Sequence, residues 1–349
     1  MPEFDDAWVA EELRREAEVE RELLEKQPKL FKSIENLELS ENQRNFVNVC
    51  KASFESTKWA FRRPPYPSNT LCDDFEALFA KADSLEHLSS MLNDFWRLVV
   101  EIARMVPVNE AWGALMAGCL TVLQERPGEV KSGYPLLWKD LPGLDEVLQD
   151  VWRNDPTVVD QENQGSPPSQ EDLSKWENLN HFFAYFFADG LKAGMDYSWI
   201  QFPLCQLATA LEIVHEEGAL HNCRLRVACC WVQRSTDTLY RVMSCNLDLR
   251  QLTSRPSSFR LKGPRCPGAI QPFSLERWNN WKHDFLVDGS NRVDLGLDHK
   301  TVGMILDTIL YMTWAEDPKA QDRFLAELKL KVVERSAAAS NTLLHPREV

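Results

Sequence analysis

The chain has 349 residues, with 39 Lys and Arg against 53 Asp and Glu, and its formal net charge is −14. This acidic balance argues against a nucleic-acid coat or a binder of anionic membranes, because contacts to phosphates need a surplus of basic side chains. With 44% hydrophobic residues and 12 Trp the chain can build a packed core, and its length allows one large domain or two domains of about 150 residues.

The N-terminus and the cysteines favour an intracellular protein. The sequence begins MPEFDDAWVAEE, which is acidic, whereas a secretory signal needs a basic start and an apolar run. We therefore expect no export signal and a cytoplasmic or nuclear location. The longest largely apolar stretch, residues 111–124, is too short for a membrane span of about 20 residues. The nine cysteines are an odd number, and we interpret them as reduced, mostly buried thiols.

Two helices are predicted in the N-terminal region. A thin apolar stripe through a dense run of Glu and Arg indicates a mostly solvated helix at residues 10–24. Ser40 and Gln43 have the spacing of a capping box, and apolar residues follow them at helical intervals. This second helix is expected to stop at the proline-rich run of residues 62–67. We take that run as a boundary and interpret residues 1–66 as an N-terminal helical extension.

The strongest helical signal begins at Leu85. From there to Val106, seven apolar residues recur at alternating intervals of three and four, a spacing that no strand produces. Residues 109–126 follow, and we expect them to form the central helix of the fold because apolar side chains cover nearly all of its surface. Further helices are predicted at about residues 144–152, 173–190, 198–218, 220–243, 274–285, 298–312 and 317–332.

These patterns predict an all-α protein. Alternating apolar runs joined by tight-turn pairs, which indicate strands, are missing apart from an Asp-Gly pair between two helical patterns. We expect an array or bundle of about ten to twelve helices without a substantial sheet. The helical domain is placed at residues 67–335, interrupted by a mobile acidic loop at residues 154–172 that Gly and Pro break. Residues 336–349 are expected to form a disordered tail.

Four segments of the chain resemble a known family. They are GYPLLWKDLP (133–142), WENLNHFFAYFFADGLKAGMDYSWIQFPLCQLATALE (176–212), RLRVACCWVQRSTDTLY (224–240) and PFSLERWNNWKHDF (272–285). Their order and spacing are similar to those of a group of filamentous-fungal proteins that share a domain of unknown function. The resemblance covers roughly residues 70–315 and implies a shared helical fold. Its motifs are mainly Trp and small residues that pack helices, so it implies no catalytic residue.

Histidines and cysteines near residue 220 raise the question of a metal site. The residues concerned are His215, His221, Cys223, Cys229 and Cys230. Imidazole and thiolate are ligands that zinc prefers, but C-x-x-C spacing is missing from the sequence, so we interpret these cysteines as core residues. The sequence also lacks a nucleophile elbow, a metalloprotease motif, a P-loop and a dinucleotide fingerprint. We therefore predict no catalytic residue, no metal site and no cofactor.

Charge is distributed unevenly in the second half of the chain. Residues 221–265 carry a large excess of Lys and Arg, and residues 140–220 a large excess of Asp and Glu. Such segregation can create an anion-binding face, because guanidinium groups match phosphates and carboxylates. The candidate residues are Arg255, Arg260, Lys262 and Arg265. The alternative is that the basic stretch packs against the acidic helices or is simply solvated.

Two hypotheses of function follow. The first is a non-enzymatic helical module that acts through contacts with an unidentified protein partner. The sequence predicts many helices and contains no recognisable catalytic motif. The second is a small-molecule binder or enzyme that uses a Trp-lined pocket between helices, with Arg224, Arg277 or His221 at its mouth. The tryptophans considered are Trp176, Trp199, Trp231, Trp278, Trp281 and Trp314.

Overall fold

The computed structural model describes residues 14, 32–57, 66–106, 111–126, 137–158, 167–192, 197–213, 217–244, 263–266, 270–317 and 319, which we call the described part of the chain. Within it the backbone forms ten α-helices and two short 3-10 helices, and no strand. The prediction of an all-α fold with ten to twelve helices is therefore confirmed. None of these described helices has both the length and the hydropathy needed to cross a membrane.

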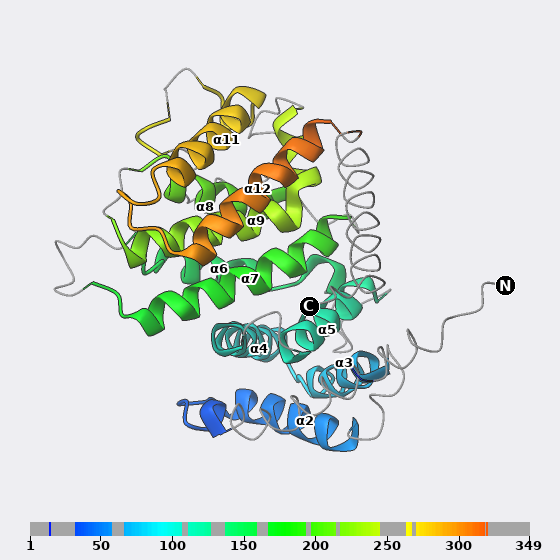
Figure 1. Ribbon diagram of the computed structural model, residues 1–349. Helices are drawn as coiled ribbons and strands as arrows, with labels where there is room; N and C mark the ends of the chain where they lie inside the picture. The colour runs from blue at the N-terminus through cyan, green and yellow to red at the C-terminus, as the bar shows by residue number, and fades with distance from the viewer. Residues whose placement is uncertain are drawn as a thin grey trace, which may run out of the picture.

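The helices are arranged from one end of the molecule to the other in an order close to that of the sequence (Figure 1). The first half contains α2 (Glu41–Thr57), α3 (Tyr66–Phe79), α4 (Leu85–Met105), α5 (Ala111–Glu125), η1 (Trp138–Asp140) and α6 (Leu144–Arg153). The second half contains α7 (Gln170–Lys192), η2 (Tyr197–Ile200), α8 (Gln201–Leu211), α9 (Ala219–Ser244), α11 (Leu275–Ser290) and α12 (His299–Glu316). Helices α2, α3 and α4 lie at one end and α11 and α12 at the other, with α7 and α9 between them.

Helix α4 has nearly the bounds that its apolar ladder predicts. Ser84 caps its N-terminus, because the Ser84 hydroxyl accepts a hydrogen bond from the His87 amide at 3.0 Å. The ladder residues Leu88, Phe95 and Ile102 are buried. The spacing of three and four therefore places one continuous face of α4 in the core.

Helix α2 begins with the predicted capping box. The Gln43 amide donates to Ser40 Oγ at 3.1 Å, and the Ser40 amide donates to Gln43 Oε1 at 3.0 Å. Phe46 and Cys50 of α2 are buried in the same core cluster as α3 and α4. Residues 41–57 thus pack against the helices that follow the proline-rich run, while the domain limits at residues 66 and 335 stay predictions.

The sequence predicts no helix over residues 66–79, but the structure has α3 there. Pro67 belongs to the expected helix stop, yet it stands in the first turn of α3, where a proline is tolerated because the first amides have no partner within the helix. Leu71, Phe75 and Phe79 recur at intervals of four and are buried. The apolar spacing was therefore present beyond the prolines.

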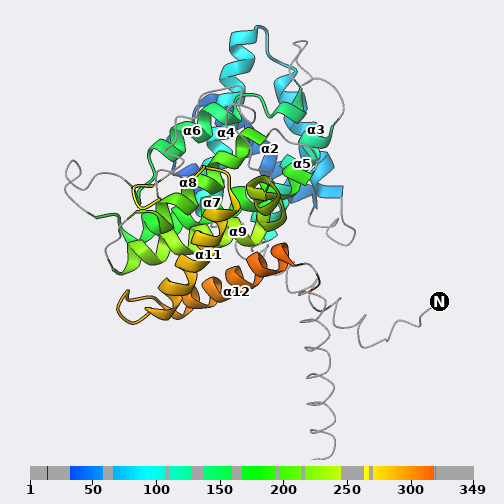
Figure 2. The same cartoon turned by 90° about the horizontal axis from the view of Figure 1, so that it is seen from above.

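Helix α9 separates two core clusters, a position that the sequence analysis assigned to residues 109–126. We call the clusters the N-terminal core, which extends from Ile34 to Trp231, and the C-terminal core, which extends from Ile200 to Met312. Val227 of α9 lies in the first and Ala228, the next residue, in the second. Helices α7 and α12 pack against α9, and α12 covers it on the outside in both views (Figures 1 and 2).

A buried arginine joins three of these helices. Arg226 of α9 donates from Nε to Glu177 Oε1 of α7 at 2.9 Å and from Nη1 to Asp298 Oδ2 at 2.7 Å. Asp298 also caps α12 by accepting from the Thr301 amide at 2.7 Å. Arg226 therefore connects α7, α9 and the start of α12, and its charge is balanced by two carboxylates.

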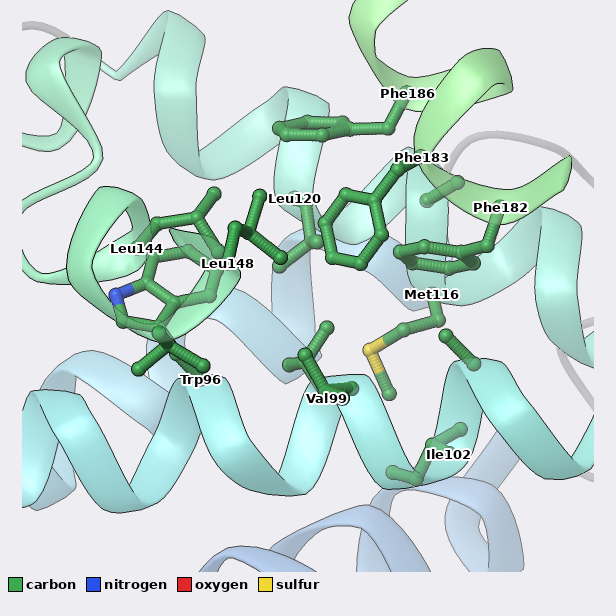
Figure 3. Packing of buried hydrophobic residues seen from close by; sticks show 14 of the residues in the cluster. Trp96, Val99, Ile102, Met116, Leu120, Leu144, Leu148, Phe182, Phe183 and Phe186 are labelled. Carbon is green, nitrogen blue, oxygen red and sulfur yellow. The ribbon is translucent and has the colours of Figure 1, made fainter. Parts of the chain in front are cut away.

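Aromatic and aliphatic side chains fill the N-terminal core (Figure 3). Phe182, Phe183 and Phe186 reach into it from α7. On the side of α4, the Trp96 ring lies beside Leu144 and Leu148 of α6. The predicted aromatic run of α7 thus packs against several helices at once.

Replacing Phe95 with Ala tests this packing. The Phe95 ring centroid lies 5.1 Å from that of Phe46, 5.0 Å from Phe75 and 5.6 Å from Phe79. Because the surrounding rings come from two other helices, α2 and α3, and cannot all close the cavity, we expect the free energy of unfolding to fall by about 3–5 kcal/mol in urea denaturation. The control Leu306→Ala, on a side chain that is 58% exposed, should change it by about 0.5 kcal/mol or less. Equal losses would contradict this account of the core.

Candidate functional site

A buried ion pair joins the end of α8 to α11. Glu212 follows α8 directly, and Arg277 lies in the first turn of α11. Arg277 donates from Nε to Glu212 Oε1 at 2.7 Å and from Nη2 to Oε2 at 3.0 Å. Trp281, one turn later, donates from Nε1 to Glu212 Oε1 at 2.8 Å, and its ring lies 4.5 Å from the Arg277 guanidinium carbon. The bidentate pair and the indole together satisfy the buried carboxylate.

The same carboxylate anchors the chain just before α11. The Gly263 amide donates to Glu212 Oε2 at 2.6 Å, and the Arg265 amide donates to the Glu212 carbonyl oxygen at 2.8 Å. A Cβ atom at Gly263 would lie 2.5 Å from the Glu212 Cβ and 2.7 Å from its carbonyl oxygen. Only glycine fits this close approach of two backbones.

The residues of this ion pair lie in segments that we interpret as packing motifs. Glu212 ends the segment 176–212 and Arg277 lies in the segment 272–285, so two of the segments that carry the family resemblance meet here. Arg277 is one of three alternatives expected at the mouth of a Trp-lined pocket, but its side chain is 1% exposed and pairs with Glu212. One feature of the sequence points to the pair: Glu212 and Arg277 are charged residues within segments that are otherwise rich in apolar side chains, and charged side chains are rarely buried unless they are paired.

A second group of titratable side chains lies between the start of α9 and α11. His221 is 3% exposed, and its Nε2 lies 3.8 Å from Asp288 Oδ2. Burial lowers the pKa of His221 from 6.5 to about 4, and the charges of Arg224 and Arg265 act in the same direction. Burial, followed by the charge of Asp284, raises the pKa of Asp288 from 3.8 to about 6. At neutral pH the imidazole is therefore neutral and the Asp288 carboxylate is charged.

Of the four residues of the predicted anion-binding loop, the structure describes one. Arg255, Arg260 and Lys262 lie outside the described residues, whereas Arg265 is described and exposed. Arg226, which belongs to the same basic stretch, pairs with a carboxylate of the acidic stretch, as the alternative interpretation expects. The anion-binding role of the loop stays a prediction.

The histidines and cysteines considered for a metal site do not lie together in the structure. Cys223 and Cys230 belong to the N-terminal core and Cys229 to the C-terminal core, while His215 lies outside the described residues. Burial raises the pKa of Cys229 and of Cys230 to about 12, so both thiols are protonated at neutral pH. Within the described part of the chain, no three His, Cys, Asp or Glu residues are arranged to hold a metal ion.

The tryptophans considered for a pocket also divide between the two cores. Trp176, Trp199 and Trp231 belong to the N-terminal core, Trp278 and Trp281 to the C-terminal core, and Trp314 is half-buried. The indole of Trp231 donates to Asn180 Oδ1 at 2.9 Å, and that of Trp278 to Glu316 Oε1 at 2.9 Å. These rings are packing elements of separate clusters and do not surround a common pocket.

A groove of about 500 Å³ opens beside α4 and α6. Its apolar surface comes from Leu37, Leu39, Leu98, Val100, Val147 and Val151. Its charged rim consists of Glu38, Arg97, Glu101, Arg104 and Asp150. Arg97 and Asp150 face each other across α4 and α6 at 3.5 Å, with half of each side chain exposed. No local sequence pattern predicts the groove, because three separate segments of the chain supply its walls.

One wall of the groove is fixed to α4. Asp94 Oδ2 accepts hydrogen bonds from Ser40 Oγ at 2.9 Å and from Asn42 Nδ2 at 3.0 Å. The Gln43 side chain, which takes part in the capping box of α2, donates to the Asp94 carbonyl oxygen at 3.3 Å. The segment that carries Leu37 and Leu39 therefore leads into a helix start that hydrogen bonds hold against α4.

A family model for proteins of unknown function, DUF3632, matches residues 96–285. The match covers more than half of the chain. The chain belongs to the DUF3632 family. The predicted membership in a family of unknown function is thereby confirmed, although the matched range is shorter than the predicted one. No curated protein and no solved structure matches the chain.

Replacing Arg277 with Met tests the ion pair inside the DUF3632 region. The variant leaves the Glu212 carboxylate buried without its cation, so we expect the free energy of unfolding to fall by about 3–5 kcal/mol in urea denaturation. The matched control is Lys175→Met, which removes an exposed pair with Glu171 on α7 and should change stability by about 0.5 kcal/mol or less. A loss at Arg277 as small as that at Lys175 would show that the pair does not hold α11.

His221→Asn and Asp288→Asn should alter the pH dependence of stability in opposite directions. The wild type loses stability as the pH falls from 6.5 towards 4, because unfolding lets His221 take up a proton, and His221→Asn lacks this loss. Above about pH 6 the charged, buried Asp288 weakens the fold, so Asp288→Asn is more stable there, and its advantage disappears as the pH falls from 6 to 3.8. Urea midpoints measured across this range check both. Parallel profiles for all three proteins would contradict the assignment.

Proposed function

We propose that this member of the DUF3632 family is a non-enzymatic protein-interaction module, which takes a short polypeptide segment of a partner protein in the groove beside α4 and α6. The observation that carries the proposal is the groove itself. It has an apolar surface, a rim of charges and one wall fixed by the Asp94 hydrogen bonds. Its volume of about 500 Å³ is enough for several side chains.

A polypeptide fits this groove because its walls offer two kinds of contact in one place. Leu37 and Leu39 are half-buried and line the groove together with Val147 and Val151, so apolar side chains of a partner can displace water there. The charged side chains stand at the edge, where they can fix the register of an incoming segment without full desolvation. Apolar anchors inside a polar rim are the usual anatomy of a protein interface.

The charges favour a basic partner. Three carboxylates and two guanidinium groups form the rim, so acidic groups are in excess. The chain as a whole has a net charge of −14, which attracts cationic partners over longer distances. The expected ligand is therefore a segment whose apolar residues are flanked by Lys or Arg.

The state of the buried nucleophiles supports a non-enzymatic role. Burial raises the pKa of Cys50, Cys205 and Cys229 to about 12. At neutral pH these thiols are protonated, and the thiolate is the form that attacks a substrate. Cys50 and Cys229 are thus unreactive thiols of the two cores.

Selection of short random peptides on the full chain tests the proposal. We expect enrichment of peptides with apolar residues next to Lys or Arg. In fluorescence anisotropy, Leu39→Glu and Asp150→Lys should each raise the Kd of such a peptide at least about tenfold, which is ~1.4 kcal/mol. The first variant places a charge on the apolar surface of the groove, and the second reverses a charge of its rim.

The control for this experiment is Leu306→Glu, an exposed position on α12 outside the groove. It should leave the Kd unchanged, and circular dichroism should show that all three variants are folded. The proposal is wrong if no peptide is enriched, or if enriched peptides bind the groove variants as tightly as they bind the wild type.

Small-molecule binding at His221 and Asp288 is a second candidate function. The observation that favours it is the pair of opposite pKa shifts, to about 4 and about 6, next to the exposed Arg265. Perturbed groups of this kind are common at binding sites. We rank this candidate below the groove because the site has no described cavity beside it.

We further infer that the protein is fungal and acts inside the cell, in the cytoplasm or the nucleus. The resemblance of the segments 133–142, 176–212, 224–240 and 272–285 to filamentous-fungal proteins supports the source. The eight described cysteines are all free thiols, which supports a reducing compartment.

A further inference from the structure

Two cysteine side chains meet where α3 packs against α5. The Sγ atoms of Cys72 and Cys119 are 3.3 Å apart, and the Cys72 thiol donates to the Cys119 carbonyl oxygen, also at 3.3 Å. Both side chains are fully buried. A disulfide bond has a length of about 2.0 Å, so a small shift of the two side chains is enough to bring the sulfurs to bonding distance.

The surroundings of the pair keep both sulfurs reduced until an oxidant reaches them. The hydrogen bond with Cys72, together with burial, raises the pKa of Cys119, while the charge of Arg126 opposes this rise. The thiol is therefore a slow nucleophile near neutral pH. Full burial also excludes bulky oxidants, so only a small molecule can reach the pair through local opening of the helices.

We propose that Cys72 and Cys119 form a modification site, at which a small hydroperoxide such as hydrogen peroxide converts the two thiols into a disulfide that locks α3 to α5. The contact of two sulfurs from different helices is the observation that carries this proposal. It is independent of the proposed function, because neither cysteine lines the groove.

The reaction balances with one peroxide. The thiolate of one cysteine attacks a peroxide oxygen, the O–O bond breaks, and the departing oxygen leaves as water with the proton that this thiol has lost. The product is a sulfenic acid. The second thiol attacks its sulfur, the S–S bond forms, and the displaced hydroxide leaves as water with the second thiol's proton. The two sulfurs lose two electrons in total, and one peroxide is reduced to two waters.

The disulfide would enclose all of α4. Its residues 85–105 lie between the two cysteines, which are 47 positions apart in the sequence. Closing a loop of this length restricts the unfolded chain and so raises the stability of the folded one. We expect the thermal midpoint of the oxidised protein to rise by roughly 5 °C.

Peroxide treatment of the folded, full-length chain tests the proposal. After treatment the protein is denatured, the remaining thiols are alkylated, and the digest is mapped by mass spectrometry. We expect a peptide pair linked through Cys72 and Cys119 as the main oxidation product, which dithiothreitol reverses, together with the rise in thermal midpoint. Cys205 and Cys266 are more exposed and serve as internal competitors in the same digest.

Two variants complete the experiment. Cys72→Ala should abolish the linked peptide and the rise in midpoint, whereas Cys50→Ala, at a buried cysteine of the same core, should keep both. If Cys72→Ala does not fold, the peptide map of the oxidised wild type still shows whether Cys72 and Cys119 are linked. The proposal is overturned if Cys72 and Cys119 are alkylated after treatment that oxidises Cys205 or Cys266, if they become sulfinic acids without a link, or if other cysteine pairs dominate.

Discussion

The burial of α9 on opposite sides is the constraint on which the rest of the fold depends. Neighbouring residues such as Val227 and Ala228 enter different cores, so α9 must have helices packed against it on two sides. Its one buried charge, Arg226, is possible only because α7 and the start of α12 bring carboxylates to it. The helix thus fixes the positions of its neighbours through apolar contact and through charge compensation.

The bounds of a helix could be predicted closely where its apolar spacing and its capping residues are both present in the local sequence. The ladder of α4, its cap Ser84 and the capping box of α2 need only residues within a few positions of each other, so they can be read from sequence. Helix α3 was missed because Pro67 and its neighbours were interpreted as a stop, although proline is also common at helix starts. The position of α9 between the two cores was missed as well, because packing on two sides of a helix depends on partners that lie far away in the sequence.

The candidate sites could be predicted much less well. The pairing of Glu212 with Arg277 spans 65 positions, and a local pattern contains nothing that fixes the distance between them. The groove depends on residues 37–43 folding back against α4 and α6, which follows from the hydrogen bonds to Asp94. Apolar patterning indicates which residues are buried, but the placing of polar groups on the surface is decided by tertiary contacts.

The long span of the Glu212 and Arg277 pair also has a consequence for synthesis on the ribosome. All residues of the N-terminal core have been made once Trp231 is complete, whereas the C-terminal core needs residues up to Met312. Since chains fold from the N-terminus as they emerge, the first core can close while Glu212 still has no counterion. Docking of α11 then removes that charge from water, and this places the assembly of the second core after the translation of α11.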